Sequence, residues 1–278
     1  MPAFNWKARL FVGGVLSGFA YAALTAGAVA QQALPLPGFA SSEHGWLPIG
    51  GDFIQVPGAP RLVGNDATHP YVPNGTGAQP NYRVADLNNP NLKPWVKERM
   101  EKDNHEVLAG KIGYTPRSTC RPSGVPAFMV YSRFDPVYFV QTPKEVLMIF
   151  SGDQQVRHVY LDIPHSEDPK PSWYGESVGH YEGDTLVVDT IGQNTKTFVD
   201  NYRTPHSDKL HVTERWKVTD GGKALEVNIR AEDPDAFNDP WVEIQHFRRV
   251  DQPIREEVCA ENNLQFEYQI PVADKPDF

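Results

Sequence analysis

Apolar and polar residues alternate with a period of two over much of residues 137–250, and this pattern is typical of half-buried β-strands. The runs predicted to form strands are 137–141, 146–151, 156–162, 176–181, 184–191, 210–219, 224–232, 241–250 and 255–260. Turn-forming residues separate these runs, with tight hairpin signals at 181–184 and at 220–222. The spacing predicts an all-β, antiparallel meander that closes into an up-and-down barrel or a strongly curved sheet.

The segment before these strands has a different pattern. Proline, glycine and asparagine recur through residues 31–95, and regular structure is not expected there. One helix is predicted over 94–110, because Pro94 suits a first turn and Gly110 suits a C-cap. The predicted organisation is an N-terminal arm with this helix over 31–114, a barrel domain over 115–270 and a short tail over 271–278.

Residues 1–30 are predicted to be a cleaved secretory signal peptide. Lys7 and Arg9 precede an apolar run over 10–26, and Ala28-Val29-Ala30 forms a small-x-small cleavage site. The alternative is a membrane anchor, although the run is slightly short and contains glycine and serine. Export predicts a periplasmic or secreted protein with no membrane contact after cleavage.

The net charge of the chain limits the classes of partner that we expect it to bind. Cleavage would change the formal net charge from −9 to −11, since 24 Lys and Arg would then stand against 35 Asp and Glu. An acidic chain without a basic run repels nucleic acid and anionic lipid. The expected partner is a small-molecule ligand or substrate, and a homo-oligomer is compatible with the sequence.

The chain has two cysteines, Cys120 and Cys259. In an oxidising compartment, an isolated pair is most simply a disulfide. The alternative is a nucleophilic thiol, but no activating motif surrounds either residue.

Glu214 lies in the predicted strand 210–219, on the same face as Leu210, Val212, Trp216 and Val218. A carboxylate on an apolar face must be paired, or its pKa must rise. Glu214 is therefore either an acid or base in a cavity, or the partner of an internal arginine.

A second carboxylate pair is predicted across the hairpin at 181–184. If its turn has two residues, Tyr181 pairs with Asp184, and Glu176 lies opposite Asp189. Like charges in that position are unfavourable. A proton, an arginine, a metal or His180 would relieve the conflict, and so would a different register.

Two loops repeat the pattern Pro-His-Ser-acid, at His165 and at His206, and His211 follows the second. Each imidazole is a candidate general acid or base. Three histidines with Glu214 could also bind a metal, but the His206-to-His211 spacing matches no standard zinc motif. The structural alternative is a loop histidine that caps backbone groups.

The connection 192–203 is long for a hairpin and is predicted to be a binding loop. Asn194, Thr197 and Asp200 either contact a ligand or hold the loop through local side-chain turns. No phosphate-binding glycine motif, nucleophile elbow or His-Glu-x-x-His motif occurs. No cofactor is therefore expected, although a metal stays an alternative.

Several motifs resemble those of a large group of secreted bacterial proteins, most of which have no assigned function. They are the stretches at 120–126, GDTLVVDTIGQNTKT at 183–197, PHSDKLHVTERW at 205–216, EDPDAFNDPW at 232–241 and VCAENN at 258–263. The resemblance covers about residues 115–263 and implies the disulfide and a lipocalin-like barrel. The group often has Gly-Phe-Asn where this chain has Gly192-Gln193-Asn194, which implies a more polar pocket here.

Two main hypotheses for function follow. The first is a cofactor-independent lyase or isomerase acting on a small apolar, aromatic acid in a barrel cavity. Its catalytic candidates are Glu214, His206, His165, Asp189 and His180, and its substrate-binding candidates are Asn194, Thr197, Trp216, Tyr181 and His211. The second is a non-catalytic protein that binds a small molecule or a metal. An envelope scaffold with purely structural polar residues is a third possibility.

Overall fold

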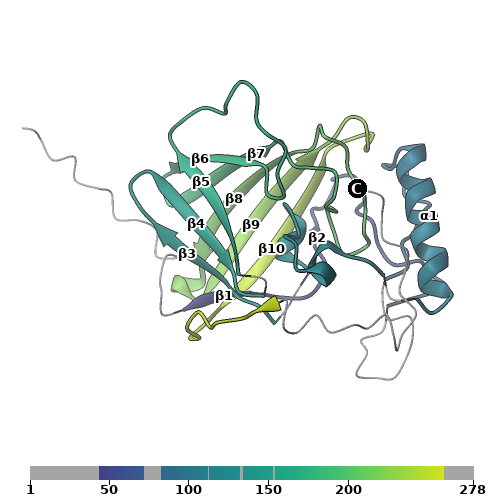
Figure 1. The fold of residues 1–278 in the computed structure, drawn as a ribbon, viewed down its shortest axis with the longest axis horizontal. Helices are drawn as coiled ribbons and strands as arrows, with labels where there is room; N and C mark the ends of the chain where they lie inside the picture. The colour runs from purple at the N-terminus through teal and green to yellow at the C-terminus, as the bar shows by residue number, and fades with distance from the viewer. Residues whose placement is uncertain (1–43, 72–82, 112, 132–133, 153, 260–278) are drawn as a thin grey trace, which may run out of the picture. The chain divides into compact units, whose positions relative to one another are not determined.

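The computed structural model describes residues 44–71, 83–111, 113–131, 134–152 and 154–259, and it shows an all-β barrel with one α-helix (Figure 1). Nine strands close the barrel in the order β1-β3-β4-β5-β6-β7-β8-β9-β10, because β10 pairs back to β1. The strands are β1 Gly45–Pro48, β3 Val137–Gln141, β4 Glu145–Phe150, β5 Gln155–Leu161, β6 Glu176–Glu182, β7 Thr185–Ile191, β8 His211–Thr219, β9 Ala224–Glu232 and β10 Trp241–Val250. The short strand β2, Ile54–Gln55, adds to β10. The predicted barrel is confirmed.

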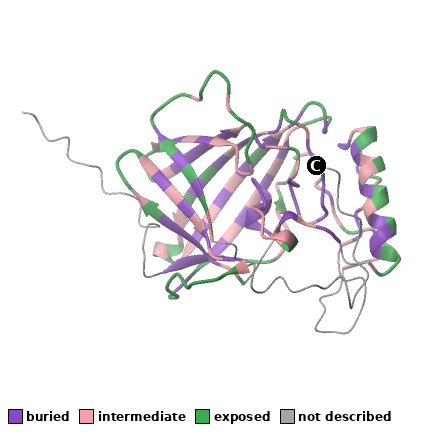
Figure 2. Ribbon diagram, viewed as in Figure 1, coloured by how far each residue is buried: buried purple, intermediate pink, exposed green. Residues whose placement is uncertain are grey.

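The alternation seen in the sequence separates the inside of the barrel from the outside. In β8, Val212, Glu214 and Trp216 are fully buried, whereas Arg215 and Lys217, on either side of Trp216, are exposed. Bands of buried and less buried residues alternate along the strands in Figure 2. The inward side chains of the strands are large and pack on one another, so they fill the interior of the barrel.

β1 comes from the arm in which no regular structure was expected, and that prediction was wrong. All four of its residues are buried, and it pairs with both β3 and β10. Gly45 permits this close approach, because a Cβ there would lie 2.7 Å from the Cβ of Pro136. Trp46 then points into the core with no exposed surface. The arm therefore completes the barrel as well as covering it.

The pairing of β5 with β6 departs from a purely antiparallel meander. These neighbours run parallel, with Val159 opposite Ser177 and Leu161 opposite Gly179. A parallel pair requires a crossover connection, which here is the loop over residues 162–175. The other neighbouring strands in the barrel pair antiparallel, as expected.

Two segments outside the strands cover the barrel. The predicted helix is confirmed as α1, Pro94–Leu108, whose Val96 and Met100 belong to the main core. Gly110 has the positive φ of 82° that commonly follows a helix end. The 3-10 turn η3, Ala127–Met129, inserts Phe128 against Trp216, and Gln245 Nε2 donates to the Met129 carbonyl at 3.0 Å.

The predicted disulfide is present between Cys120 and Cys259, with 5.6 Å between their Cα atoms. The strand expected at 255–260 does not form over the described residues 255–259. Just before this segment, Tyr138 Oη donates to the carbonyls of Gln252 and Pro253. Among the described residues, no helix has the length and apolar character needed to cross a membrane. The signal peptide and the C-terminal tail predicted from the sequence lie outside the described residues.

Candidate functional site

The parallel pair β5–β6 opens a groove in the barrel wall. The two strands pair only from Val159 and Ser177 onward. Before β6, the chain turns away from β5, and Ser172 forms a bridge with Gln193 instead. Among the described residues, the first half of β5 therefore has no strand partner on this side, and a groove of about 530 Å³ occupies the opening. Ligand pockets commonly have volumes of about 300–1,000 Å³.

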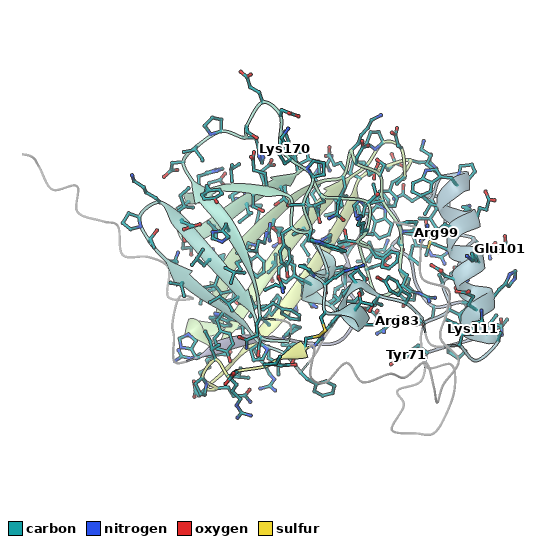
Figure 3. The ribbon with its side chains drawn as sticks, in the orientation of Figure 1. Tyr71, Arg83, Arg99, Glu101, Lys111 and Lys170 are labelled. Carbon is teal, nitrogen blue, oxygen red and sulfur yellow. A yellow bond between two sulfur atoms is a disulfide. The ribbon has the colours of Figure 1, made fainter. Side chains whose placement is uncertain are left out.

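The walls of the groove combine aromatic and polar side chains. Tyr160 comes from the outer face of β5, and Trp173 and Tyr174 come from the crossover loop. Lys170 also lies on this loop (Figure 3), and it lines the groove. Glu176, at the start of β6, adds a carboxylate. This mixture suits a flat organic molecule with a few polar groups.

Arg157 and Ser177 form the base of the groove and connect it to the barrel interior. Both terminal nitrogens of Arg157 donate to Glu214, at 3.0 and 2.5 Å. Its Nε donates to Ser177 Oγ at 3.1 Å, and its Nη2 also donates to Thr190 Oγ1 at 2.7 Å. Arg157 is 2% exposed and Glu214 has no exposed surface.

This network explains how a carboxylate lies on the apolar face of β8. A buried charge requires a partner and further hydrogen bonds, and Arg157 supplies both to Glu214. All three guanidinium nitrogens are engaged inside the protein. The structure thus places Glu214 against an internal arginine, and not against His165 or His206. Sequence reasoning missed Arg157, Ser177 and Thr190, although Arg157 lies on the buried side of the alternation in β5.

Trp216, a predicted substrate-binding residue, lies in the packed interior. Its ring stacks on Phe128 at 6.3 Å between centroids and contacts Phe139 and Phe247 edge-on or tilted. Arg157 also lies over the Phe128 ring, 5.7 Å from its centroid. Trp216 therefore fills the barrel beneath η3 and does not line the groove between β5 and β6.

A chain of imidazoles and carboxylates runs along the outer face beside the groove. His165 lies between Glu176 and Asp189, with 3.0 Å from Nδ1 to Glu176 Oε1 and 2.7 Å from Nε2 to Asp189 Oδ1. His211 Nε2 lies 2.7 Å from the other Asp189 oxygen. Ser166 donates to both oxygens of Glu176, at 2.7 Å each. The structure thus brings together three residues predicted for the site: His165, Asp189 and His211.

The register of this hairpin differs from the prediction. Its two-residue loop is Gly183-Asp184, so Asp189 lies opposite Val178, and Glu176 lies opposite Ile191. A shift of one residue in the loop moves the pairing by two positions. The two carboxylates are consequently diagonal neighbours, and His165 bridges them in place of His180.

The surroundings of these imidazoles and carboxylates favour the ionised forms of Asp189, His211 and Glu176. Burial raises the pKa of Asp189, but hydrogen bonds and charges from His211 and His165 outweigh it and lower the pKa to about 2. The hydrogen bond to Asp189 raises the pKa of His211. Hydrogen bonds from Ser166 lower the pKa of Glu176. Since Glu176 also lines the groove, a molecule bound there would meet an ionised carboxylate that hydrogen bonds tie to Ser166 and His165.

The second Pro-His-Ser loop has a structural arrangement. His206 is 2% exposed, with Nε2 2.8 Å from Thr197 Oγ1 and Nδ1 2.7 Å from the carbonyl of Ser207. Burial lowers the pKa of His206, so the ring is neutral at neutral pH. Asn194 Oδ1 accepts from the backbone N–H of Lys196, and Asp200 accepts from Tyr202 and Thr204. These contacts match the local turns that were the alternative to ligand binding.

The remaining predicted residues lie elsewhere. His180 is exposed, 3.2 Å from Glu182. The Tyr181 hydroxyl accepts from Gln141, and burial raises its pKa. Gln193, where a more polar pocket was implied, instead bonds both backbone polar atoms of Val125, at 2.7 and 3.0 Å.

The proposed metal ligands are dispersed. Glu214 is inside the barrel, His206 is in the loop before β8, and His165 and His211 meet Asp189 outside. Within the part of the chain that the structure describes, no group of three His, Cys, Asp or Glu side chains is arranged to hold a metal ion.

Comparison with known proteins adds no family. No protein-family model, curated protein or solved structure matches this chain. The resemblance drawn from its motifs therefore stays a prediction, and the functional argument rests on the geometry described above.

Proposed function

We propose that this chain is an exported protein that binds a small, flat, amphipathic molecule in the groove between β5 and β6. The observation that carries the proposal is the groove itself, which has the volume of a ligand site and three aromatic walls beside polar groups. The intramolecular disulfide agrees with an oxidising compartment. Aromatic acids suit the site because Tyr160 and Trp173 offer ring contacts, and because the exposed Lys170 can exchange its ion pair with Asp168, at 2.9 Å, for a ligand carboxylate.

Binding is preferred to turnover because of where the predicted acid and base groups lie. Glu214 is held by Arg157, and His206 is buried against Thr197. Neither presents a free proton-transferring atom to the groove. The site therefore lacks the pairing of Glu214 with an imidazole on which the lyase hypothesis depended.

Lyase or isomerase chemistry remains a second candidate on one observation. Glu176 lines the groove and contacts His165, which contacts Asp189 in turn. In this version Glu176 moves the proton, and His165 positions Glu176 and shares its charge. The catalytic group is then Glu176 and not Glu214.

The test is a binding and turnover screen of the mature protein. A panel of aromatic carboxylic acids is followed by tryptophan fluorescence and by mass spectrometry, with and without EDTA. We expect saturable binding without a change of ligand mass, and at least tenfold weaker binding in Trp173→Ala. Trp95→Ala is the matched control, because Trp95 lies on α1 and is 40% exposed.

Each other outcome is informative. Loss of carbon dioxide or water that survives EDTA and disappears in Glu176→Gln would favour the enzyme. Activity lost with EDTA alone would indicate a metal. Equal ligand affinity in Trp173→Ala and the wild type would remove the groove as the binding site.

A further inference from the structure

A second, much smaller cavity lies where the N-terminal arm meets the start of β10. Phe53 and Leu62 line it from the arm, and Asp200 lines it from the loop between β7 and β8. Trp241 and Glu243 line it from β10. Its volume of about 20 Å³ is enough for one water-sized group. None of these residues lines the groove between β5 and β6.

Two buried carboxyl groups line this cavity. Glu243 is 1% exposed and Asp200 is 5% exposed. Burial, and secondarily the charge of Asp200, raises the pKa of Glu243 well above its usual range. Burial also raises the pKa of Asp200 to about 6, against the hydrogen bonds from Thr204 and Tyr202. The local arrangement thus favours a neutral Glu243.

Two other observations indicate that the cavity accommodates a polar group. Among the described residues, Glu243 Oε2 and Trp241 Nε1 have no hydrogen-bond partner, although both atoms are fully buried. Both residues line the cavity. An unmade hydrogen bond of a buried group costs about 1–3 kcal/mol, so native proteins rarely leave two together.

The chemistry of these groups restricts what fits between them. An anion is disfavoured by the two carboxyl groups, and a cation is disfavoured by the indole N–H of Trp241, which requires an acceptor. A hydroxyl group satisfies both sides, because it accepts from Trp241 and also exchanges a hydrogen bond with Glu243. We propose that this cavity is a second binding site, which takes one hydroxyl group of a neutral alcohol or polyol between Trp241 and Glu243.

Arg83 ties segments of the arm to one another beside this site, and its guanidinium lies 5.8 Å from the ring centroid of Tyr202, which also lines the cavity. Arg83 Nε contacts Asp52 at 2.8 Å, and its Nη2 donates to the carbonyl of Gly51 at 3.1 Å. The guanidinium also lies 4.3 Å from the ring centroid of Tyr71 (Figure 3). The Asp52 side chain is 43% exposed and forms the rim. Because the cavity holds a single water-sized group, only the hydroxyl group enters it, and the carbon skeleton of the ligand then lies outside, beyond Asp52.

The experiment observes the indole N–H of Trp241 by nitrogen-15 NMR in the full chain, with Trp241→Phe identifying its signal. Glycerol and glucose are the neutral probes, and acetate and methylammonium are the charged comparators. We expect a saturable shift of the Trp241 signal with a neutral probe only. Glu243→Gln should retain the site, because an amide both donates and accepts. Glu243→Leu should weaken binding about tenfold through the lost hydrogen bond.

The proposal is overturned if no neutral probe shifts the signal, or if Glu243→Leu binds as well as the wild type. Water contacts to Trp241 that persist at saturating probe would identify a permanently bound water instead. If Glu243→Leu does not fold, ligand-detected saturation transfer can compare polyol binding by Trp241→Phe and the wild type, because this variant lacks the indole N–H. Equal polyol affinity in the two proteins would refute the site. Trp173→Ala should leave polyol binding unchanged, which separates this result from failure of the groove.

Discussion

Glu214 and Glu243 both point into the barrel, yet the charge nearest to each has the opposite sign: it is positive beside Glu214 and negative beside Glu243. Glu214 receives two hydrogen bonds from Arg157, which supplies the opposite charge. Glu243 is close enough to Asp200 for their charges to raise its pKa further. The same residue type therefore acts as a counter-ion at one position and as a neutral acid at the other.

Removal of one partner from the Arg157–Glu214 pair should be costly. In Glu214→Gln the buried guanidinium loses its counter-ion, and we expect a loss of about 3–5 kcal/mol in the free energy of unfolding. Denaturant titration measures this change. Glu182→Gln is the control, because the Glu182–Arg215 pair on the outer face is about half exposed and screened by solvent, and should contribute far less. Equal losses in the two variants would contradict the buried role of Glu214.

Glu243→Gln should change how stability depends on pH. The pKa of Glu243 is raised above 4.5 in the folded state, so its contribution is fully present at low pH and is lost as pH rises through the folded-state pKa. A glutamine does not titrate, and the variant should gain stability relative to the wild type as pH rises from 5 to 8. The gain is at most about 1.4 kcal/mol per pH unit. Denaturant titration of the variant and the wild type at both pH values tests this. If the difference in their free energies of unfolding does not depend on pH, Glu243 is already ionised in the folded protein over this range.

The sequence contained the signal for Glu214 but only half of its explanation. Alternation in β8 placed the carboxylate among apolar residues, and an internal arginine was one of the stated alternatives. Arg157 was not identified, because it lies on β5 and Glu214 lies on β8. Which inward-facing residues of these strands meet depends on how the intervening strands β6 and β7 pair, and the sequence does not show that pairing. The same alternation holds Glu243 between Trp241 and Phe247 in β10, and it could have identified that residue too.

At the scale of elements, local patterns predicted strands better than their partners. The runs at 137–141, 224–232 and 241–250 match the observed strands. β1 was missed because a four-residue strand with Gly45 and Pro48 has no readable alternation, and its burial arises only from closure against β10. The parallel course of β6 was missed because the crossover loop resembles any other turn-rich connection.

Trp46 offers a test of whether β1 is an integral part of the barrel. Trp46→Ala removes a fully buried side chain between β3 and β10, and we expect a loss of about 3–5 kcal/mol in the free energy of unfolding. Trp95→Ala should cost much less, since Trp95 is 40% exposed and mainly loses one hydrogen bond to the Asp235 carbonyl. Denaturant titration of both variants gives the comparison. A small effect at Trp46 would mean that the barrel is stable without β1.

At the scale of the whole molecule, closure depends on segments distant in sequence. The disulfide joins residues 139 positions apart, from the segment before η3 to the end of the described chain after β10. Gln193 and Gln245 fasten the same η3 region to the barrel through backbone hydrogen bonds. Side chains and a covalent bridge thus secure the segment that inserts Phe128 over the interior.

Replacement of both cysteines by serine should lower the free energy of unfolding by about 2–5 kcal/mol, because the bridge restricts the unfolded chain. Denaturant titration of the wild type with and without reductant should reproduce that difference, whereas reductant should not affect the double variant. The strands should still form, since the disulfide lies outside the hydrogen-bonded sheet. A loss below about 1 kcal/mol would show that noncovalent contacts, including those from Tyr138 to the segment after β10, already hold the two regions together.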